Sequence, residues 1–429
     1  MRFGIWGTEA GVEQESEFPN PEPNGGISLL RLFQSSRRFE NMRSDVIAEI
    51  ISWFFLLWVL NFYFFYPIVL WIDSLFFKHP VKKGPCEPTI SLFISAYNEE
   101  SIIAEKIENV LSLDYPRDKL EIVVVSDASS DRTDEIVKSY ENRGVKLHRM
   151  PERSGKIPGL NDAIPRAKNE IIVLTDANCM YNKETLRALV PNFADPKVGA
   201  VNGEHIFLNK KESTVERGVG FYWKYETWMK RMESAIHSNV FITGAMIALR
   251  RELYPEGIGG ELNLDNILPL VVVNRGYRVI YEDKAIVTEE TAKNPKEEFR
   301  GRVRTTIRGF WMVRQIPHFI STSRHPIFVF HLLCRKIFRW LVAPFLIMLF
   351  FGNMCLSLYS PNYRICFFIQ ILFYLSALIG WMFDRKGIKF KLFNIIYYFC
   401  LINAAALDGF IRFLLGQKVS TWTHATRKY

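Results

Sequence analysis

Cysteine is scarce in this sequence, and its spacing excludes two kinds of structural site. Six cysteines occur among 429 residues, and none forms a Cys-x-x-Cys pair. At least three of them fall in apolar segments, so neither a disulfide framework nor a zinc site is indicated. We therefore expect reduced thiols in a protein whose polar part faces the cytosol.

Two further absences narrow the possible classes. The first predicted strand runs into Ser95-Ala-Tyr-Asn-Glu-Glu100, which contains no glycine. A dinucleotide-binding fold needs G-x-G-x-x-G at this turn so that the backbone can approach a pyrophosphate, and that fold is excluded. No short apolar run occurs near the N-terminus, so we expect no secretory signal.

Acidic residues are outnumbered by basic ones, 45 to 54, which gives a formal net charge of +9. This excess alone suits nucleic acid, anionic lipid or a diphosphate equally well. The basic residues cluster beside apolar segments, and this pattern favours lipid head groups as partners over nucleic acid.

Long apolar runs predict an integral membrane protein. A span needs about 20 apolar residues, and four segments qualify: Ile50–Ile72, Phe338–Leu358, Ile365–Phe383 and Phe390–Leu415. Lysines after the first run and the basic loop Asp384–Lys391 favour a cytosolic location for these ends and for the domain between the spans. Four spans would leave the basic C-terminal tail outside, whereas Asn403 and Asp408 suggest that the last segment is re-entrant or lies on the surface. The topology of this end stays open.

The predicted organisation has six parts: a partly disordered polar and basic segment (1–48), a transmembrane helix (49–73), a catalytic domain (84–309), interfacial helices (310–336), about three transmembrane helices (337–416) and a basic tail (417–429). Within the catalytic domain, strands are expected at Thr89–Ala96, Glu121–Ser126, Val145–His148 and Glu170–Thr175. Helical patterns lie between them, and this alternation indicates an α/β fold with a sheet flanked by helices. Ligands bind such sheets at the carboxyl ends of the strands.

Polar residues follow these strands where a ligand would bind. Asp127 can accept hydrogen bonds from a base or ribose, whereas Asp131 is expected to cap the next helix. Gly155-Lys156 precedes a helix and would suit a phosphate. Asp176 and Asn178 end an apolar strand with their side chains on one face, and such oxygen ligands can hold Mg²⁺ or Mn²⁺ on a diphosphate. Taken singly, each motif would more often be an ordinary turn.

Taken in order, the motifs resemble glycosyltransferase family 2, whose nucleotide-sugar-binding domain has the GT-A fold, and more closely its cellulose-synthase-like membrane branch. The resemblance covers about Thr89 to Gly309 and is carried by Ala96-Tyr-Asn-Glu99, Asp127, Gly155-Lys156, Asp176-Ala-Asn178, Thr243-Gly-Ala245, Leu264-Asp265, Arg275-Gly-Tyr-Arg278 and Arg302-Val-Arg304. It implies a Rossmann-like mixed sheet flanked by helices and inserted between transmembrane helices.

The resemblance also implies a role for individual residues. Asp265 would be the catalytic base that deprotonates an acceptor hydroxyl, and direct attack would invert the anomeric configuration. Asp176 would bind the Mg²⁺ or Mn²⁺ cofactor, with Asn178 beside it. The remaining residues would bind substrates: Tyr97, Glu99, Asp127, Lys156, Asp176 and Arg304 the nucleotide sugar, and Trp223 and Gly244 the acceptor.

Departures from the family pattern shape the expected function. Asn178 replaces the second carboxylate of the usual D-x-D motif and offers less charge to a metal. The synthase Q-x-x-R-W element reads Gly301-Arg-Val-Arg-Thr305, and Thr305 cannot stack on a growing glycan as the tryptophan does. We therefore expect an inverting transferase for surface polysaccharide or glycoconjugate synthesis. It would move one or a few sugars from a nucleotide-diphosphate sugar, such as a UDP-sugar, to a membrane-proximal glycan or lipid-linked acceptor. A processive synthase with an atypical gate and a catalytically inactive nucleotide- or glycan-binding relative are the alternatives.

Overall fold

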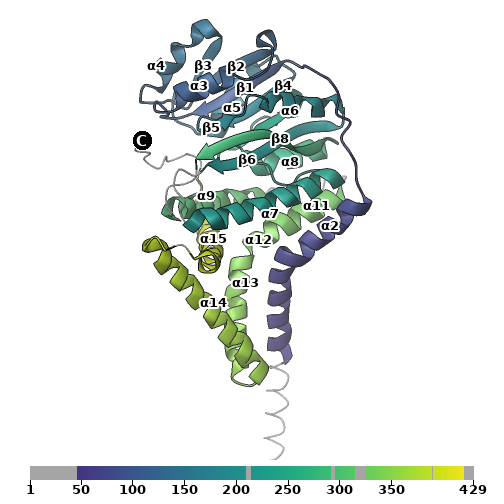
Figure 1. Ribbon diagram of the computed structural model, residues 1–429, viewed down its shortest axis with the longest axis vertical. Helices are drawn as coiled ribbons and strands as arrows, with labels where there is room; N and C mark the ends of the chain where they lie inside the picture. Colours follow the sequence, from purple (N-terminus) through teal and green to yellow (C-terminus); the bar gives the residue numbers. More distant parts are fainter. Residues whose placement is uncertain (1–45, 209–213, 291–294, 315–324, 389, 420–429) are drawn as a thin grey trace, which may run out of the picture.

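The computed structural model describes residues 46–208, 214–290, 295–314, 325–388 and 390–419, except for the side chains of residues 214–223 and 295. The described residues form a sheet domain at one end and apolar helices at the other (Figure 1). Between the two lie α7 (Thr214–Ile236), α9 (Pro295–Val313) and α11 (Pro326–Leu332). The predicted polar segment 1–48 falls almost wholly outside the described residues.

Eight strands form one mixed sheet in the order β3-β2-β1-β4-β7-β6-β8-β5. Their bounds are β1 Ile90–Ala96, β2 Leu120–Ser126, β3 Val145–Arg149, β4 Ile171–Asp176, β5 Cys179–Tyr181, β6 Val198–Leu208, β7 Ile247–Arg250 and β8 Arg278–Glu290. The first four strands in this order are mutually parallel. β7 runs antiparallel to both β4 and β6, and β5 runs antiparallel to β8. The predicted mixed sheet is confirmed, and the four strands expected from the sequence are β1 to β4.

Helices cover both faces of the sheet, which explains why every residue of β1 is buried rather than every second one. Leu92 and Ile94 belong to the core cluster that contains residues of α3, while Phe93 belongs to the cluster that contains residues of α5 and α8. The helices of the sheet domain are α3 Ile103–Leu111, α4 Thr133–Lys138, α5 Lys156–Ala163, α6 Thr185–Leu189 and α8 Leu264–Asn274.

Three described helices are long and apolar enough to cross a membrane: Val46–Phe76, which ends in α2 (Tyr66–Phe76), α14 (Pro361–Arg385) and α15 (Lys391–Leu414). The pair formed by Pro326–Trp340 and α13 (Val342–Ser357) is bent by 58° and counts as a fourth if it is one span. This pair begins with α11 and continues through η7 (Leu333–Ile337) and α12 (Phe338–Trp340). The apolar runs predicted from the sequence therefore coincide with these helices.

α15 differs from the other apolar helices in direction. α13 and α14 run along the length of the molecule in Figure 1, whereas α15 is viewed nearly end-on below α9. Gly409 allows close packing on α9, since a Cβ there would lie 2.8 Å from the Cβ of Thr306. After α15 the chain returns to α9: Trp311 Nε1 donates to the carbonyl of Gln417 and Arg308 Nε to that of Val419, each at 2.9 Å.

Gly309, the predicted end of the catalytic domain, lies within α9, which runs from Pro295 to Val313. Gly309 does not end the helix. A Cβ at this position would lie 2.3 Å from Cη2 of Trp340, so the glycine makes room for the indole at the bend before α13. Residues 315–324 of the predicted interfacial segment lie outside the described residues.

Candidate active site

The carboxyl ends of β1, β2 and β4 meet at one edge of the sheet. The register places Ala96 opposite Ser126 and Ser95 opposite Asp176. The residues that follow β1 and β2 are therefore neighbours, and Tyr97 and Asp127 line one small pocket together with Lys156. This is the edge at which the sequence predicted a ligand.

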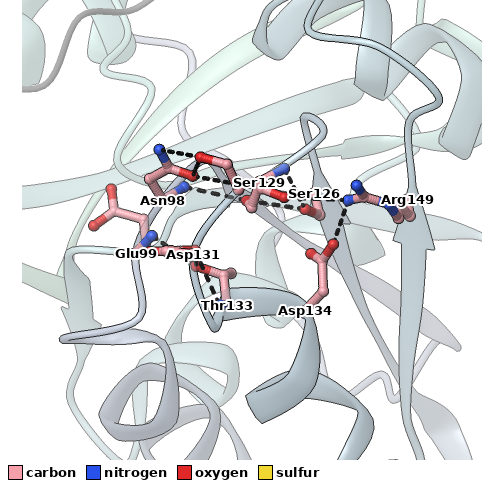
Figure 2. A network of polar contacts seen from close by, with 9 residues as sticks. Asn98, Glu99, Ser126, Ser129, Asp131, Thr133, Asp134 and Arg149 are labelled. Atoms are coloured by element: carbon pink, nitrogen blue, oxygen red, sulfur yellow. Dashed lines mark hydrogen bonds and ion pairs between the residues drawn. The ribbon is translucent and has the colours of Figure 1, made fainter.

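A polar network holds the loops after β1 and β2 together (Figure 2). Asn98 has a φ of 52°, and its Oδ1 accepts from the backbone N–H of Ser130 at 2.8 Å. Thr133 Oγ1 accepts from the backbone N–H of Glu99 at 2.8 Å and donates to Asp131 at 2.6 Å. Asp131 also accepts from the backbone N–H of Thr133, the first residue of α4, at 3.0 Å, so its carboxylate satisfies one N–H group at the helix start although Arg132 occupies the N-cap position. The network fixes the backbone of Glu99, whose side chain is buried.

Asp127 supports the turn that carries Lys156. Its Oδ1 accepts from the backbone N–H of Ser154 at 2.8 Å, and both oxygens accept from that of Gly155, at 3.0 and 2.9 Å. Gly155 has a φ of 104°, a conformation that favours glycine, and α5 begins directly after it. Asp127 thus positions this loop, a role that was not predicted, and its expected contact with a nucleoside stays a prediction.

Lys156, Asp176 and Asp265 converge around Gly244. Lys156 Nζ lies 2.5 Å from Asp176 Oδ1, and about a fifth of each side chain is exposed (21% and 18%). A Cβ at Gly244 would lie 2.8 Å from Asp265 Oδ1 and 3.5 Å from Lys156 Nζ. Three charged side chains from α5, β4 and α8 therefore share one partly exposed site, and the glycine leaves room for them.

Buried amide side chains fix the glycine turn and the start of α8. β7 runs antiparallel to β4, so the turn before β7 lies beside the carboxyl end of β4. Asn202 in β6 donates to the carbonyls of Thr243 at 3.1 Å and Met246 at 2.6 Å. Asn263 caps α8 by accepting from the backbone N–H of Asp265 at 3.1 Å. Asn202 was not predicted, because its partners lie 41 and 44 residues away in the sequence.

The surroundings of Asp265 make it a stronger base than an ordinary aspartate. Burial raises the pKa of Asp265 and Asp176 raises it further, while Lys156, Lys336 and the backbone N–H of Gly244 oppose this rise. Burial lowers the pKa of Lys156, but the two carboxylates outweigh it and the pKa is raised overall. The lysine therefore stays charged at neutral pH.

α9 brings two arginines to the same edge. Burial lowers the pKa of Arg304, and nearby Asp176 opposes this change. Burial and then Arg304 lower the pKa of Arg308 to about 10, and Asp265 opposes the change. Both guanidinium groups remain cationic at neutral pH. Together with Lys156 they outnumber the two carboxylates, an arrangement that suits a diphosphate.

The oxygen-bearing side chains after β4 fit a divalent cation of the Mg²⁺ type, although not as a preformed cage. Among the described residues, no three His, Cys, Asp or Glu side chains converge on one point. Asp176 offers a carboxylate, while the amide nitrogen of Asn178 donates to Glu289 Oε1 at 2.6 Å. Mg²⁺ usually takes one or two carboxylates and completes its shell with phosphate oxygens and water. Glu289, which was not predicted as a site residue, places a second carboxylate next to Asn178.

The predicted acceptor residues have different outcomes. Trp223 lies on α7, as expected, but its side chain is outside the described part of the chain. Gly244 lies against Asp265. A further residue was not predicted: Lys336 of η7 donates to Oδ1 of Asn266, the residue after Asp265. It was missed because it belongs to a segment that read as an interfacial helix.

Comparison with known proteins identifies the domain. Residues 91–257 match the family model described as glycosyl transferase family 2. This part of the chain belongs to glycosyltransferase family 2. Mannosyltransferase PcManGT from Pyrobaculum calidifontis, solved with GDP-Man and Mn²⁺, has a TM-score of 0.64 and 21% identity, over 87% of this chain and 99% of that one. The GT-A fold predicted from the strand-end motifs is confirmed.

Curated relatives of the family 2 domain include enzymes named for lipid and for glycan products. Probable glycosyltransferase YdaM of Bacillus subtilis is 30% identical over 51% of this chain and 54% of its own length. Beta-monoglucosyldiacylglycerol synthase of Trichormus variabilis is 31% identical over 35% of this chain and 33% of its own length. Poly-beta-1,6-N-acetyl-D-glucosamine synthase of Staphylococcus aureus is 27% identical over 63% of this chain and 70% of its own length. The match spans a third to about half of the first two relatives.

Proposed function

We propose that the protein is an inverting glycosyltransferase that moves a sugar from a nucleotide-diphosphate sugar to a membrane-proximal glycan or lipid-linked acceptor. The observation that carries this proposal is the convergence of Lys156, Asp176 and Asp265 around Gly244. It supplies a base, a metal-binding carboxylate and a phosphate-binding cation at the strand ends of a GT-A sheet.

The chemistry follows from these positions. Asp265 accepts the proton of an acceptor hydroxyl while the oxygen attacks the anomeric carbon. The bond from that carbon to the diphosphate breaks, its electron pair leaves with the nucleoside diphosphate, and the configuration inverts. Lys156 and Arg304 bind the diphosphate. Mg²⁺ or Mn²⁺ held by Asp176 would neutralise charge on this leaving group. Thr305 is exposed, and its hydroxyl donates to the carbonyl of Gly301 at 3.0 Å. It offers no ring on which a growing glycan could stack, and this supports addition of one or a few sugars.

The membrane part is proposed to have three spans: helix Val46–Phe76, the bent pair that ends in α13, and α14. α15 would lie on the cytosolic surface, because the chain after it contacts α9 through Gln417 and Val419. The basic loop Asp384–Lys391 and the basic tail then share the side of the catalytic domain, in accord with the positive-inside rule. A reporter that is active only in the cytosol, fused after Tyr429, should be active; an inactive fusion would contradict this topology.

The test of the activity is a donor screen with the full-length protein in membranes. Purified protein is mixed with a panel of UDP- and GDP-sugars and Mn²⁺ or Mg²⁺, and product mass and released nucleotide are recorded. Asp265→Asn should lower transfer by about 10²–10⁴-fold, as expected for loss of a positioned base, and leave nucleotide affinity nearly unchanged. Exposed Asp118→Asn is the matched control. No turnover with any donor would reject the proposal.

A further inference from the structure

A cavity of about 110 Å³ lies where the catalytic domain meets the membrane helices. We name it the junction cavity and define it by Glu226, Asn266, Arg302, Arg335, Lys336 and Arg339. Asn266 follows Asp265 directly in α8, so one wall of the cavity adjoins the proposed base.

Basic side chains predominate in the lining of the junction cavity, with Glu226 as its acidic member. Arg335 pairs with Glu226 at 2.6 Å and with Glu233 at 2.8 Å, and Arg339 shares Glu226 at 2.6 Å. Arg302 of α9 pairs with a glutamate of its own helix at 2.8 Å. The three arginines are therefore paired with three carboxylates.

Lys336 is the fourth basic side chain of this lining, and it has a different environment. It donates to the amide oxygen of Asn266 and lies over the ring of Phe241 at 4.6 Å. In the described part of the chain, its ammonium group has no carboxylate at ion-pair distance; Asp265, Glu226 and Glu233 act on it from farther away. A buried ammonium group without an adjacent counter-charge is costly, and an anion placed here would be stabilised.

A second cavity lies among the membrane helices. It measures about 380 Å³, and its lining is almost wholly apolar. We name it the membrane cavity and define it by Trp53, Leu56, Leu349, Ile369, Phe373 and Phe399. Tyr63 lines the junction cavity and Phe399 the membrane cavity, and their ring centroids lie 5.5 Å apart, so the two linings meet at this aromatic pair.

From the membrane towards Asp265, the cavity lining is thus first apolar and then rich in basic side chains, and it ends next to the proposed catalytic base. We propose that the two cavities bind the acceptor, and that this acceptor is a lipid in which a phosphate joins a hydrocarbon tail to a hydroxyl-bearing head group. The tail occupies the membrane cavity, the phosphate lies beside Lys336 in the junction cavity, and the hydroxyl reaches Asp265. This inference rests on the proposed function and names its acceptor class.

Two other acceptor classes fit the cavities less well. A soluble glycan would leave the membrane cavity without an occupant. An uncharged lipid such as diacylglycerol would fill that cavity but bring no anion to Lys336. The charge of the lining therefore decides in favour of the phosphate-bearing lipid.

The experiment compares two lipids, of which only one carries a phosphate between its hydrocarbon part and a hydroxyl-bearing head group. Full-length protein is placed in phosphatidylcholine nanodiscs that contain either phosphatidylglycerol or diacylglycerol at equal mole fraction. Lipid retained by the protein is measured by native mass spectrometry, and sugar transfer by nucleotide release. The protein should retain phosphatidylglycerol over diacylglycerol. Lys336→Met should lower this retention about tenfold, because a charge-assisted contact is lost, and leave nucleotide affinity unchanged.

The controls separate this inference from simpler explanations. Lys386 is an exposed lysine in the basic loop, and Lys386→Met should retain phosphatidylglycerol like the unmodified protein. Leu349→Trp narrows the membrane cavity and should lower retention without lowering nucleotide affinity. Equal retention of the two lipids, or equal behaviour of the two lysine variants, would overturn the inference, as would loss of nucleotide binding in Lys336→Met.

The outcome also distinguishes the acceptor site from the activity. If phosphatidylglycerol is retained through Lys336 but no donor gives product, the lipid site stands and the proposed function fails. If sugar is transferred to diacylglycerol as fast as to phosphatidylglycerol, the proposed function stands and the phosphate-bearing acceptor is rejected.

Discussion

Gly244 offers the sharpest test of the proposed base. Its backbone N–H donates to the Asp265 carboxylate, and an added Cβ would lie 2.8 Å from Asp265 Oδ1. Carbon and oxygen atoms that are not bonded rarely approach below 3 Å, so Gly244→Ala must push the carboxylate away. Lys156 Nζ would be 3.5 Å from the new methyl group, an ordinary contact. The substitution therefore displaces the base and spares the lysine.

The size of the effect follows from the role of the base. General-base catalysis contributes about 10²–10⁴-fold, and a misplacement of about 1 Å can cost about 10²-fold. We expect kcat to fall at least about 10²-fold. The affinity for the nucleotide sugar should change by less than about threefold, because the substitution spares Lys156; a tenfold change would correspond to about 1.4 kcal/mol of binding free energy.

The assay is steady-state transfer with the best donor of the screen, combined with nucleotide binding by calorimetry. Gly301→Ala is the matched control, because a Cβ there meets nothing within 4 Å and alanine is favoured within a helix such as α9. If Gly244→Ala keeps kcat within about threefold of the unmodified protein and folds equally well, Asp265 is not the base.

Three further predictions concern metal, pH and stability. Asp176→Ala, or chelation of the unmodified protein, should weaken nucleotide-sugar binding at least about tenfold by calorimetry; unchanged affinity would mean that the donor binds without a metal. Because Asp265 must be ionised to act and burial raises its pKa, kcat should fall as pH drops through a value above the ordinary aspartate pKa of about 3.9; an acid limb at or below that value would contradict the assignment. Arg335→Met leaves buried Glu226 without one partner and should cost about 3–5 kcal/mol, seen as a lower unfolding temperature. Exposed Arg412→Met should change that temperature little.

The strand ends could be predicted because their information is local. Apolar runs of strand length, each followed by polar residues, define β1, β2 and β4, and parallel pairing brings their ends together. The place of Asp127 and Asp176 at this edge could therefore be predicted from the sequence, whereas Lys156 was singled out because Gly155-Lys156 precedes a helix. The position of Asp265 followed from the family resemblance rather than from any local pattern.

Contacts between distant residues could not be predicted in the same way. Asn202 reads as a polar residue within a strand, and only the β6–β7 pairing shows that it holds the glycine turn. Asn178 reads as a weaker metal ligand, and only the β5–β8 pairing places Glu289 beside it. In both cases the partner is set by strand order, which depends on the packing of the whole sheet.

The basic residues of the junction cavity could not be predicted for a different physical reason. Arg335, Lys336 and Arg339 stand next to an apolar run, and such residues ordinarily mark the cytosolic end of a span. The bend of 58° after Trp340 carries them under the catalytic domain, where Glu226 and Asn266 meet them. The same charges can thus set the orientation of α13 and line the cavity next to Asp265. A composition rule detects the first effect, whereas the second depends on the direction of one helix break.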